Sequence, residues 1–317
     1  MFLGIEIGGT KLQLGVGRGD GVLLGLWRGA VVTERGAAGI QGQITSAIPE
    51  LLEKAGIGRA ELRGVGVGFG GPVDDGTRTV IKSHQIEGWD GFPLADWVSD
   101  VVGLPAALGN DADVAGLAEA LHGAGKGLSP IFYITIGSGI GGGFVIGGEI
   151  YRGVGKGAAE IGHLQVSRPD GGDDPPLSSL ESLASGWAIE EQARYGIRIG
   201  ADLGAVQDLA GGGPITCALI ARAAAQGHEI ARTILNDAWE ALSEAIAHVI
   251  TLLCPRRIVI GGGVSLMGED LFFAPLRQLV AERILRPFSG LTDIVPAALG
   301  EEVVVHGAIA LARKRLG

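Results

Sequence analysis

The chain has 317 residues, of which 46% are hydrophobic and 19% charged, and this composition excludes an intrinsically disordered protein. Its formal net charge is −10 and it contains no basic block, which argues against nucleic acid or an anionic membrane as a partner. The 57 glycines follow no three-residue period, so a collagen helix is excluded as well.

The start of the sequence is an apolar, strand-like pattern without a charged region or a cleavage site, and no apolar run of 18 residues occurs. We therefore expect a soluble, cytoplasmic protein. Cys217 and Cys254 lie far apart in apolar, helix-like segments, which favours buried reduced thiols over a disulfide.

The first third of the chain predicts strands that alternate with helices. Residues 39–55 carry Ile40, Ile44, Ile48 and Leu51 at helical spacing. In chain order we expect a strand–glycine turn–strand unit over 2–17, a strand over 21–27, the helix at 39–55, a glycine-rich strand at 64–69, a helix over 93–103 and a short strand that ends at Asn110-Asp111.

The rest of the chain repeats this pattern. We expect a helix over 113–125, a strand–glycine turn–strand unit over 131–151, a polar loop over 167–178, helices over 180–195, 215–226 and 228–253, a strand and glycine loop over 256–265, and helices over 270–285 and about 301–317. The repeated unit indicates two α/β halves that face a cleft. We place a small domain at 1–112 together with 301–317, and a large domain at 113–300.

Two glycine turns are candidates for phosphate binding. The N–H groups at Gly8-Gly9-Thr10 and at Gly137-Ser138-Gly139 can hold a polyphosphate, because glycine lets the backbone approach a ligand closely. Thr10 and Ser138 add hydroxyl groups, and Lys11 adds a positive charge. Hairpin turns without a ligand are the alternative interpretation. A second turn and a third glycine loop at 261–263 favour a nucleotide.

Two other nucleotide-binding motifs are not supported. Gly137, Gly139 and Gly142 match G-x-G-x-x-G, but that fingerprint needs a helix after it and a strand pattern follows here. The chain also lacks G-x-x-x-x-G-K-[ST], so it is not a P-loop enzyme.

Six motifs in order, namely IEIGGTK, GNDAD, ITIGSGIGGG, AAEIGH, LESLASG and IVIGGGV, resemble those of the ROK family of bacterial repressors and sugar kinases. The resemblance extends from residue 3 to about residue 312. It implies an actin-like ATPase (ribonuclease H-like) fold, in which two α/β domains close on ATP and a hexose, with Mg²⁺ as cofactor.

The resemblance also implies roles for individual residues. Asp111 is implied as the catalytic base that accepts a proton from the attacking sugar hydroxyl or orients it. Positions implied near the phosphates are Glu6, Gly8, Gly9, Thr10, Lys11, Gly137, Ser138 and Gly139, and those implied near the adenosine are Gly262 and Gly263. Positions implied in the sugar pocket are Gly71, Gln85, Asn110, Asp111, Glu160, His163 and Glu181. Gln85 stands where the family commonly has asparagine.

Without the resemblance, the acceptor residues have further interpretations. Asn110-Asp111 is as typical of a turn as of a strand end that projects a carboxylate toward a substrate hydroxyl. Glu160 and His163 are three residues apart and could share a helix face or a turn. His163 alone is more typical of a hydrogen-bonded interior histidine.

The sequence departs from the family pattern in two further respects, the zinc ligands and the carboxylate at position 6. Many members bind zinc through the histidine of E-x-G-H and three cysteines, but the cysteine positions here are Gly172, Asp174 and Ser179. These residues and His163 cannot supply four zinc ligands, so no zinc is predicted. Glu6 stands where the family usually has an aspartate that acts through water on the Mg²⁺ of the nucleotide. The site either accommodates the extra methylene or loses activity through it.

The expected function is an ATP-dependent hexose kinase, with the 6-hydroxyl of glucose as the favoured acceptor. An N-acetylhexosamine or fructose kinase, a polyphosphate-using glucokinase and a non-catalytic sugar sensor are the alternatives. The polyphosphate donor is considered because NDADVAGLAE resembles the same stretch of polyphosphate glucokinases. A repressor is not expected, because the first glycine turn begins within ten residues of Met1 and leaves no room for an N-terminal DNA-binding segment. A homodimer is implied by the family alone.

Overall fold

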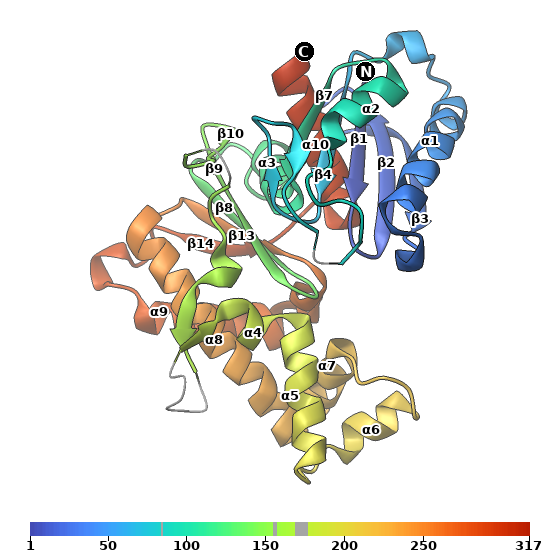
Figure 1. Ribbon diagram of the computed structural model, residues 1–317. Helices are drawn as coiled ribbons and strands as arrows, with labels where there is room; N and C mark the ends of the chain where they lie inside the picture. The colour runs from blue at the N-terminus through green and yellow to red at the C-terminus, as the bar shows by residue number, and fades with distance from the viewer. Residues whose placement is uncertain (84, 155–156, 169–176) are drawn as a thin grey trace. The chain divides into compact units, whose positions relative to one another are not determined.

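The computed structural model describes residues 1–83, 85–154, 157–168 and 177–317 (Figure 1). These residues form two compact units by their internal contacts. Unit 1 comprises Met1–Tyr133, Gly143–Ala159 and Ala297–Gly317, and unit 2 comprises Ile134–Gly142 and Glu160–Pro296. The domain limits expected from the sequence, 1–112 with 301–317 and 113–300, stay a prediction about folding domains.

The first sheet lies in unit 1 and has the strand order β3-β2-β1-β4-β7. Strands β1, β2 and β3 pair antiparallel, and β1, β4 and β7 pair parallel. The bounds are β1 (Phe2–Ile7), β2 (Lys11–Gly17), β3 (Leu23–Ala30), β4 (Gly64–Phe69) and β7 (Ala106–Asn110), and a short pair consists of β5 (Val73–Asp74) and β6 (Thr79–Val80). The parallel strands end in register at Ile7, Phe69 and Asn110, so their carboxyl ends meet at one edge of the sheet.

Helices cover both faces of this first sheet (Figure 1). Leu3, Ile5 and Ile7 of β1 pack in one core with α1 (Gly36–Ala55) and α2 (Leu94–Val102). Phe2 points the other way and packs against α10 (Val303–Leu316), which also contacts α3 (Asp111–His122). Because β1 is buried on both faces, its sequence FLGIEI is almost entirely apolar.

A glycine allows α10 to lie directly on the first sheet. The position that a side chain of Gly66 on β4 would occupy is filled by the backbone of Ala308 on α10. Only glycine lets a strand and a helix approach so closely. The last helix of the chain therefore packs at a fixed position on one face of the first sheet.

The second sheet has the strand order β10-β9-β8-β13-β14. Its strands are β8 (Ile131–Ile136), β9 (Ile140–Ile146), β10 (Glu149–Ile150), β13 (Arg257–Gly261) and β14 (Asp293–Pro296). Counted along the chain within each sheet, both orders read third, second, first, fourth, fifth. The predicted similarity of two α/β halves is thus confirmed at the level of strand order.

Four helices in the described part of unit 2 contact α8 (Glu229–Leu253), and a fifth, α6 (Gly204–Ala210), contacts one of these four, α7 (Cys217–Ala225). Trp239 of α8 is fully buried against Phe272. The other three helices that contact α8 are α4 (Leu180–Ala184), α5 (Gly186–Arg198) and α9 (Ala274–Arg283). Short 3₁₀ helices cover Thr33–Arg35, Arg59–Glu61, Ile161–His163, Gly263–Met267, Arg286–Phe288 and Gly300–Glu302, and a π-helical turn covers Glu269–Phe273.

Two expectations about unit 2 are wrong in detail. The single helix predicted over 180–195 is two helices, because Ser185 leaves the helical conformation and its side chain caps α5 by accepting the Ala188 N–H at 3.1 Å. The ends of the loop predicted over 167–178 belong to a strand pair, β11 (Gln165–Ser167) and β12 (Leu177–Ser179). Cys217 and Cys254 are free thiols, as expected, but are half-buried.

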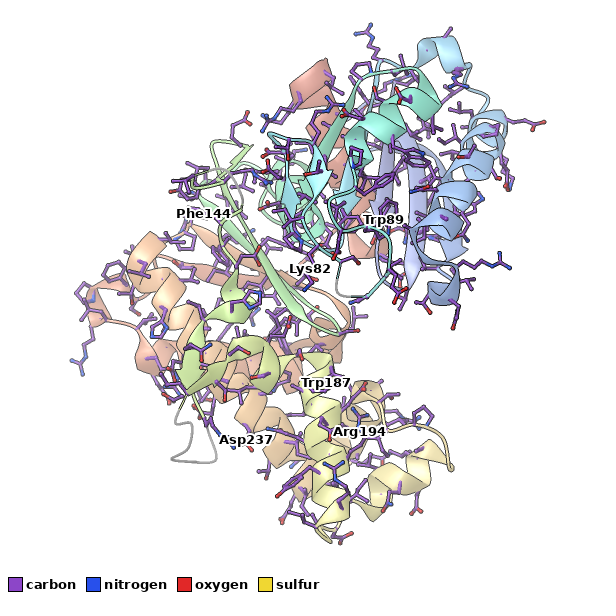
Figure 2. The ribbon with its side chains drawn as sticks, in the orientation of Figure 1. Lys82, Trp89, Phe144, Trp187, Arg194 and Asp237 are labelled. Atoms are coloured by element: carbon purple, nitrogen blue, oxygen red, sulfur yellow. The ribbon has the colours of Figure 1, made fainter. Side chains whose placement is uncertain are left out.

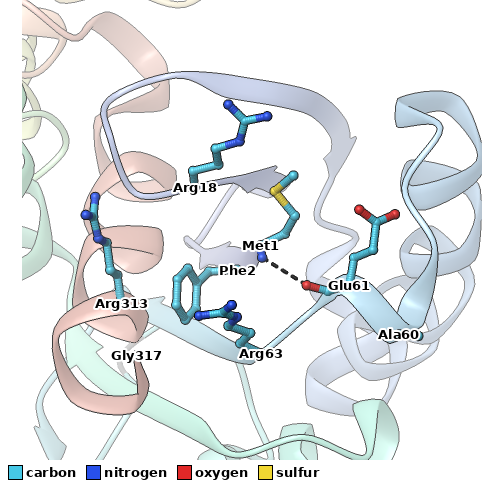
Figure 3. A pocket seen from close by; sticks show the side chains of 8 residues that line it. All are labelled: Met1, Phe2, Arg18, Ala60, Glu61, Arg63, Arg313 and Gly317. Carbon is cyan, nitrogen blue, oxygen red and sulfur yellow. Dashed lines mark hydrogen bonds between the residues drawn. The ribbon is translucent and has the colours of Figure 1, made fainter.

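A pocket of about 650 Å³ lies at the Met1 end of β1 (Figure 3). Its lining residues are Met1, Phe2, Arg18, Ala60, Glu61, Arg63, Arg313 and Gly317, and the Met1 ammonium donates to the Glu61 carbonyl at 2.9 Å. Glu6 lies toward the opposite end of the strand, roughly 13 Å away at 3.3 Å per residue. The pocket is thus remote from the predicted phosphate turn. No helix among the described residues is long and apolar enough to cross a bilayer.

Candidate active site

The first predicted phosphate turn joins β1 to β2 at the edge where the parallel strands end. The Gly8 N–H donates to the Lys11 carbonyl at 3.0 Å and so closes the turn around Gly9 and Thr10. Thr10 is exposed. Beside this turn, the Gly70 N–H donates to the Ile7 carbonyl at 2.8 Å. The turn therefore lies next to the loop that carries Gly71.

Glu6 points to the α10 side of β1 and is buried, with a relative exposure of 4%. Its Oε1 lies 3.0 Å from Lys11 Nζ, which also donates to the Glu301 carbonyl at 3.2 Å. Burial raises the pKa of Glu6 to about 7, although Lys11 lowers it, and the negative charges of Asp111 and Glu301 add to the rise. The carboxyl group thus titrates near neutral pH in the ligand-free protein.

Two oxygen atoms beside this ion pair suit a cation. Glu6 Oε2 and Gln13 Oε1 are buried and accept no hydrogen bond within the described part of the chain. Residues 6 and 13 are direct partners across β1 and β2, so their side chains share a face. Carboxylate and amide oxygens fit Mg²⁺, but no group of three His, Cys, Asp or Glu that could hold a metal occurs among the described residues. Water and phosphate oxygens would therefore supply most of the ligands.

Asn110 and Asp111 lie where β7 passes directly into α3. Asn110 Oδ1 caps α3 by accepting the N–H groups of Ala112 at 2.9 Å and Asp113 at 3.3 Å. Its amide Nδ2 donates to the Gly71 carbonyl at 3.0 Å. Asp111 Oδ1 accepts the Ala112 N–H at 2.8 Å, and its Oδ2 lies beside Gly70. The predicted base is thus held at a helix N-terminus, where a negative charge is favoured.

A buried ion pair that the sequence analysis missed supports this junction. Arg152, which follows β10, donates from Nη1 to Asp113 Oδ2 at 3.0 Å. Its Nε lies 3.4 Å from Asp75 Oδ2, and its Nη2 bonds the Val73 carbonyl at 3.5 Å. Asp113 and Arg152 are only 3% and 11% exposed. Arg152 therefore joins the first turn of α3 to the loop that follows Gly71.

Gln85 belongs to an exposed loop of unit 1, and its side-chain oxygen lies against Gly9 of the first phosphate turn. The loop is anchored by Trp89 (Figure 2), which is fully buried and packs edge-on against Phe69 with ring centres 5.7 Å apart. Gln85 also lines a pocket of about 780 Å³ next to α1. The predicted sugar-pocket residue thus contacts the phosphate turn directly.

The second predicted phosphate turn belongs to unit 2 and joins β8 to β9. The Gly137 N–H donates to the Gly139 carbonyl at 2.9 Å, and Ser138 is exposed at the tip. Glu181 Oε2 on α4 accepts the Ile140 N–H at 2.8 Å, just past the turn. Glu181 is half-buried, so its carboxylate both faces the turn and remains accessible.

The other predicted residues of unit 2 lie near the same turn. Glu160 directly precedes the 3₁₀ helix Ile161–His163 and His163 ends it. Both residues are exposed, so His163 is not an interior histidine. The backbone of Gly162 between them lies against the Ile140 carbonyl. Gly262 and Gly263 follow β13, and the backbone of Gly262 lies against Ile136 at the end of β8.

The zinc positions differ in how far the structure describes them. Gly172 and Asp174 lie outside the described residues. Ser179 is described and caps α4, since its hydroxyl accepts the Ser182 N–H at 3.3 Å. A serine hydroxyl is not among the usual zinc ligands. The described donors therefore do not fit a structural zinc, and the expectation of a zinc-free protein stays a prediction.

Comparisons with known proteins decide the family. The model of the ROK family matches residues 2–315. The chain belongs to the ROK family. This ROK chain is 32% identical to a glucokinase of Thermotoga maritima, an alignment that covers 100% of this chain and 98% of the relative. It is 31% identical to a glucokinase of Halalkalibacterium halodurans, with 96% of this chain and 93% of the relative covered.

A solved structure supports the same assignment. The ROK family glucokinase of Streptomyces griseus, crystallised in complex with glucose and AMPPNP, is 31% identical to this chain. The two structures align with a TM-score of 0.82, and 99% of each chain is covered. The expected actin-like ATPase fold of the ROK kinases is confirmed by this likeness together with the two mixed α/β sheets.

The predicted site residues therefore form one group in each unit. In unit 1, Glu6, the turn at 8–11, Gly71, Gln85, Asn110 and Asp111 lie at or beside the carboxyl ends of the parallel strands. In unit 2, the turn at 137–139, Glu160, His163, Glu181, Gly262 and Gly263 adjoin the ends of β8 and β13. Gln13, Asp113 and Arg152 were missed. A usable signal existed for Asp113, since α3 is buried on all sides and a charge inside such a helix needs a partner.

Proposed function

We propose that this ROK protein is an ATP-dependent hexose kinase that transfers the γ-phosphoryl group to the 6-hydroxyl of glucose. The observation that carries the proposal is the position of Asp111 at the β7–α3 junction, on the same sheet edge as the first phosphate turn, which follows β1 two strands away across β4. The glucokinase relatives over nearly the full chain support glucose as the acceptor.

In the proposed reaction, Asp111 accepts the hydrogen bond of the attacking sugar hydroxyl and receives its proton. The bond from that oxygen to the γ-phosphorus forms as the bond from the γ-phosphorus to the β–γ bridging oxygen breaks, and ADP leaves. Asn110 and Arg152 act through the backbone, because they fix the first turn of α3 against the loop at Gly71. Phosphoryl transfer has a loose transition state, so orientation of the hydroxyl is the main contribution that a carboxylate can make.

For the phosphate groups of ATP, the ligands proposed in unit 1 are Lys11 and the N–H groups of the turn at 8–10, and those proposed in unit 2 are the N–H groups of the turn at 137–139. The backbone of Gly262 lies against Ile136, which directly precedes the second turn, and Gly262 and Gly263 are proposed to lie near the adenosine. Mg²⁺, held through Glu6 and water, would neutralise charge on the phosphate oxygens. Gln85, Glu160, His163 and Glu181 are proposed to bind the sugar hydroxyls.

The first experiment measures ADP release with Mg²⁺-ATP and a panel of hexoses. We expect release that depends on glucose, and a decrease in kcat of about 10²- to 10⁴-fold in Asp111→Asn. Asparagine keeps an oxygen for the Ala112 N–H, so the variant should fold and bind glucose as the wild type does.

Other outcomes discriminate among the remaining functions. A better substrate among N-acetylhexosamines or fructose would change the assigned acceptor, and activity with polyphosphate alone would change the donor. Glucose binding without ADP release from either donor would identify a sugar sensor and contradict the kinase proposal.

The proposal also includes the setting of the enzyme. The net charge of −10 favours a protein without a nucleic-acid or anionic membrane partner. The two free thiols suit a reducing compartment such as the cytoplasm. We also propose that the enzyme is a homodimer. Light scattering, which measures the mass of the protein in solution, tests this.

A further inference from the structure

The phosphate turn at 137–139 is held mainly by segments that follow it in the chain. The turn itself has one closing hydrogen bond, from the Gly137 N–H to the Gly139 carbonyl. On one side, the Gly186 N–H at the start of α5 donates to the Gly137 carbonyl at 2.8 Å. On the other side, Glu181 Oε2 accepts the Ile140 N–H at 2.8 Å. The helices α4 and α5 thus hold the turn at both ends.

A third contact comes from the segment that carries Glu160 and His163. A side chain at Gly162 would collide with the Ile140 carbonyl, so only glycine lets this segment lie against β9. Ile140 is therefore contacted on its N–H by Glu181 and on its carbonyl by Gly162. The residues proposed to bind sugar and the turn proposed to bind phosphate meet at one residue of the backbone.

The two oxygens of Glu181 differ in what they contact. Oε2 accepts the Ile140 N–H, whereas Oε1 accepts no hydrogen bond from any residue that the structure describes. Glu181 is half-buried at the start of α4, and that helix is capped by Ser179. One oxygen is thus committed to the turn, and the other is available to a hydroxyl group of a ligand.

We infer that Glu181 is a positioning residue that couples sugar binding to nucleotide binding through the Ile140 N–H. This inference rests on the proposed function for the identity of the two ligands. A sugar hydroxyl that donates to Oε1 restricts the carboxylate, and the restricted carboxylate orders the turn before the nucleotide arrives. The nucleotide then pays a smaller entropy cost to order the turn, so it binds more tightly when sugar is bound. By thermodynamic linkage, each ligand increases the affinity of the other by the same factor.

The test measures binding of a non-hydrolysable ATP analogue, with Mg²⁺, by calorimetry in the absence and presence of glucose. For the wild type we expect tighter analogue binding with glucose, by at least about fivefold. Glu181→Ala should weaken the analogue about tenfold without sugar, because a hydrogen bond to a charged acceptor is lost. In this variant, glucose should no longer increase the affinity for the analogue.

Two further variants separate positioning from other effects. Glu181→Gln keeps an oxygen acceptor for the Ile140 N–H, so analogue affinity should stay within about threefold of the wild type while glucose affinity falls. Glu190→Gln is the matched control, since Glu190 Oε1 also accepts a backbone N–H in the same unit, that of Cys217 at 3.1 Å, which is not part of the turn. This variant should leave both affinities unchanged.

Amide hydrogen exchange at Ile140 gives a readout without any ligand. Exchange should be slow in the wild type and in Glu181→Gln, and at least about tenfold faster in Glu181→Ala. Unchanged exchange, or unchanged analogue binding in a folded Glu181→Ala protein, would overturn the inference. A wild type that binds no analogue would instead overturn the proposed function and the coupling together, while the exchange rate would still decide whether Glu181 positions the turn.

Discussion

The carboxyl group of Glu6 is buried near the carboxyl end of β1. Its ion pair with Lys11 offsets only part of the free-energy cost of burying the charge. Its pKa in the folded protein is raised to about 7 from 4.5, chiefly by burial. The longer glutamate side chain contacts Lys11 Nζ at 3.0 Å. The carboxylate at this position therefore has a cationic partner even without a nucleotide.

The raised pKa predicts how stability depends on pH. Between pH 4.5 and 7 the folded protein holds a proton on Glu6 that the unfolded chain has lost, so the free energy of unfolding falls as pH rises through this window. Glu6→Gln removes this titration. From pH 5 to pH 8, without nucleotide, the wild type should lose roughly 2–3 kcal/mol relative to Glu6→Gln.

Urea unfolding of both proteins at several pH values measures this difference. Lys11 is 44% exposed, so water can solvate its ammonium in the variant and the loss of the ion pair should cost little. Parallel stability curves for the two proteins would show that Glu6 has an ordinary pKa.

At the scale of elements, α3 depends on a charged residue from a distant hairpin. The first turn of α3 carries both Asp111 and Asp113, and Arg152 binds Asp113 and Asp75 on either side of it. Buried ion pairs add little net stability over apolar residues, but the loss of one partner is costly because the other charge remains buried. Arg152 thus fixes the position of α3 more than it contributes to overall stability.

We predict that Arg152→Met lowers the free energy of unfolding by about 3–5 kcal/mol, since it removes the guanidinium that lies 3.0 Å from the buried Asp113 carboxylate. The double variant Arg152→Met/Asp113→Leu should recover much of this loss. Denaturant unfolding of the two single variants and the double variant forms a mutant cycle. Additive losses in that cycle would contradict the pairing.

The sequence predicted those elements whose pattern is local. Strand–turn–strand units and long amphipathic helices such as α8 depend on neighbouring residues, and they were found. The break at Ser185 was missed because serine is common both inside helices and at their starts. Arg152 and Gln13 could not be assigned, since their partners depend on which strands and helices become neighbours in space.

The same distinction holds for the candidate site. Motif resemblance supplied the candidate residues in each unit, but no pattern in the sequence shows that Glu181 bonds the Ile140 backbone or that Asn110 uses its amide to hold Gly71. These contacts are made across 41 and 39 positions of the chain. They exist only once the sheets have formed.

For the molecule as a whole, the contact between β4 and α10 brings together segments that lie more than 200 residues apart in the sequence. Gly66→Ala would place a methyl group on the backbone of Ala308 and should lower the free energy of unfolding by about 1–3 kcal/mol. Gly42→Ala is the matched control, because Gly42 is exposed in α1 with open space beside it. It should stabilise the protein by about 0.5–1 kcal/mol. Equal melting temperatures for the two variants would show that α10 shifts freely on the sheet.

The position of α10 also sets an order of events during synthesis. β7 completes the first sheet near residue 110, but the helix that covers one face of that sheet emerges from the ribosome about 190 residues later. At 5–20 residues per second this is a delay of roughly 10–40 s. We expect unit 2 to be synthesised, and able to fold, while that apolar face of unit 1 is still uncovered. In the cell, the part of the protein that is made first is then the part that is finished last.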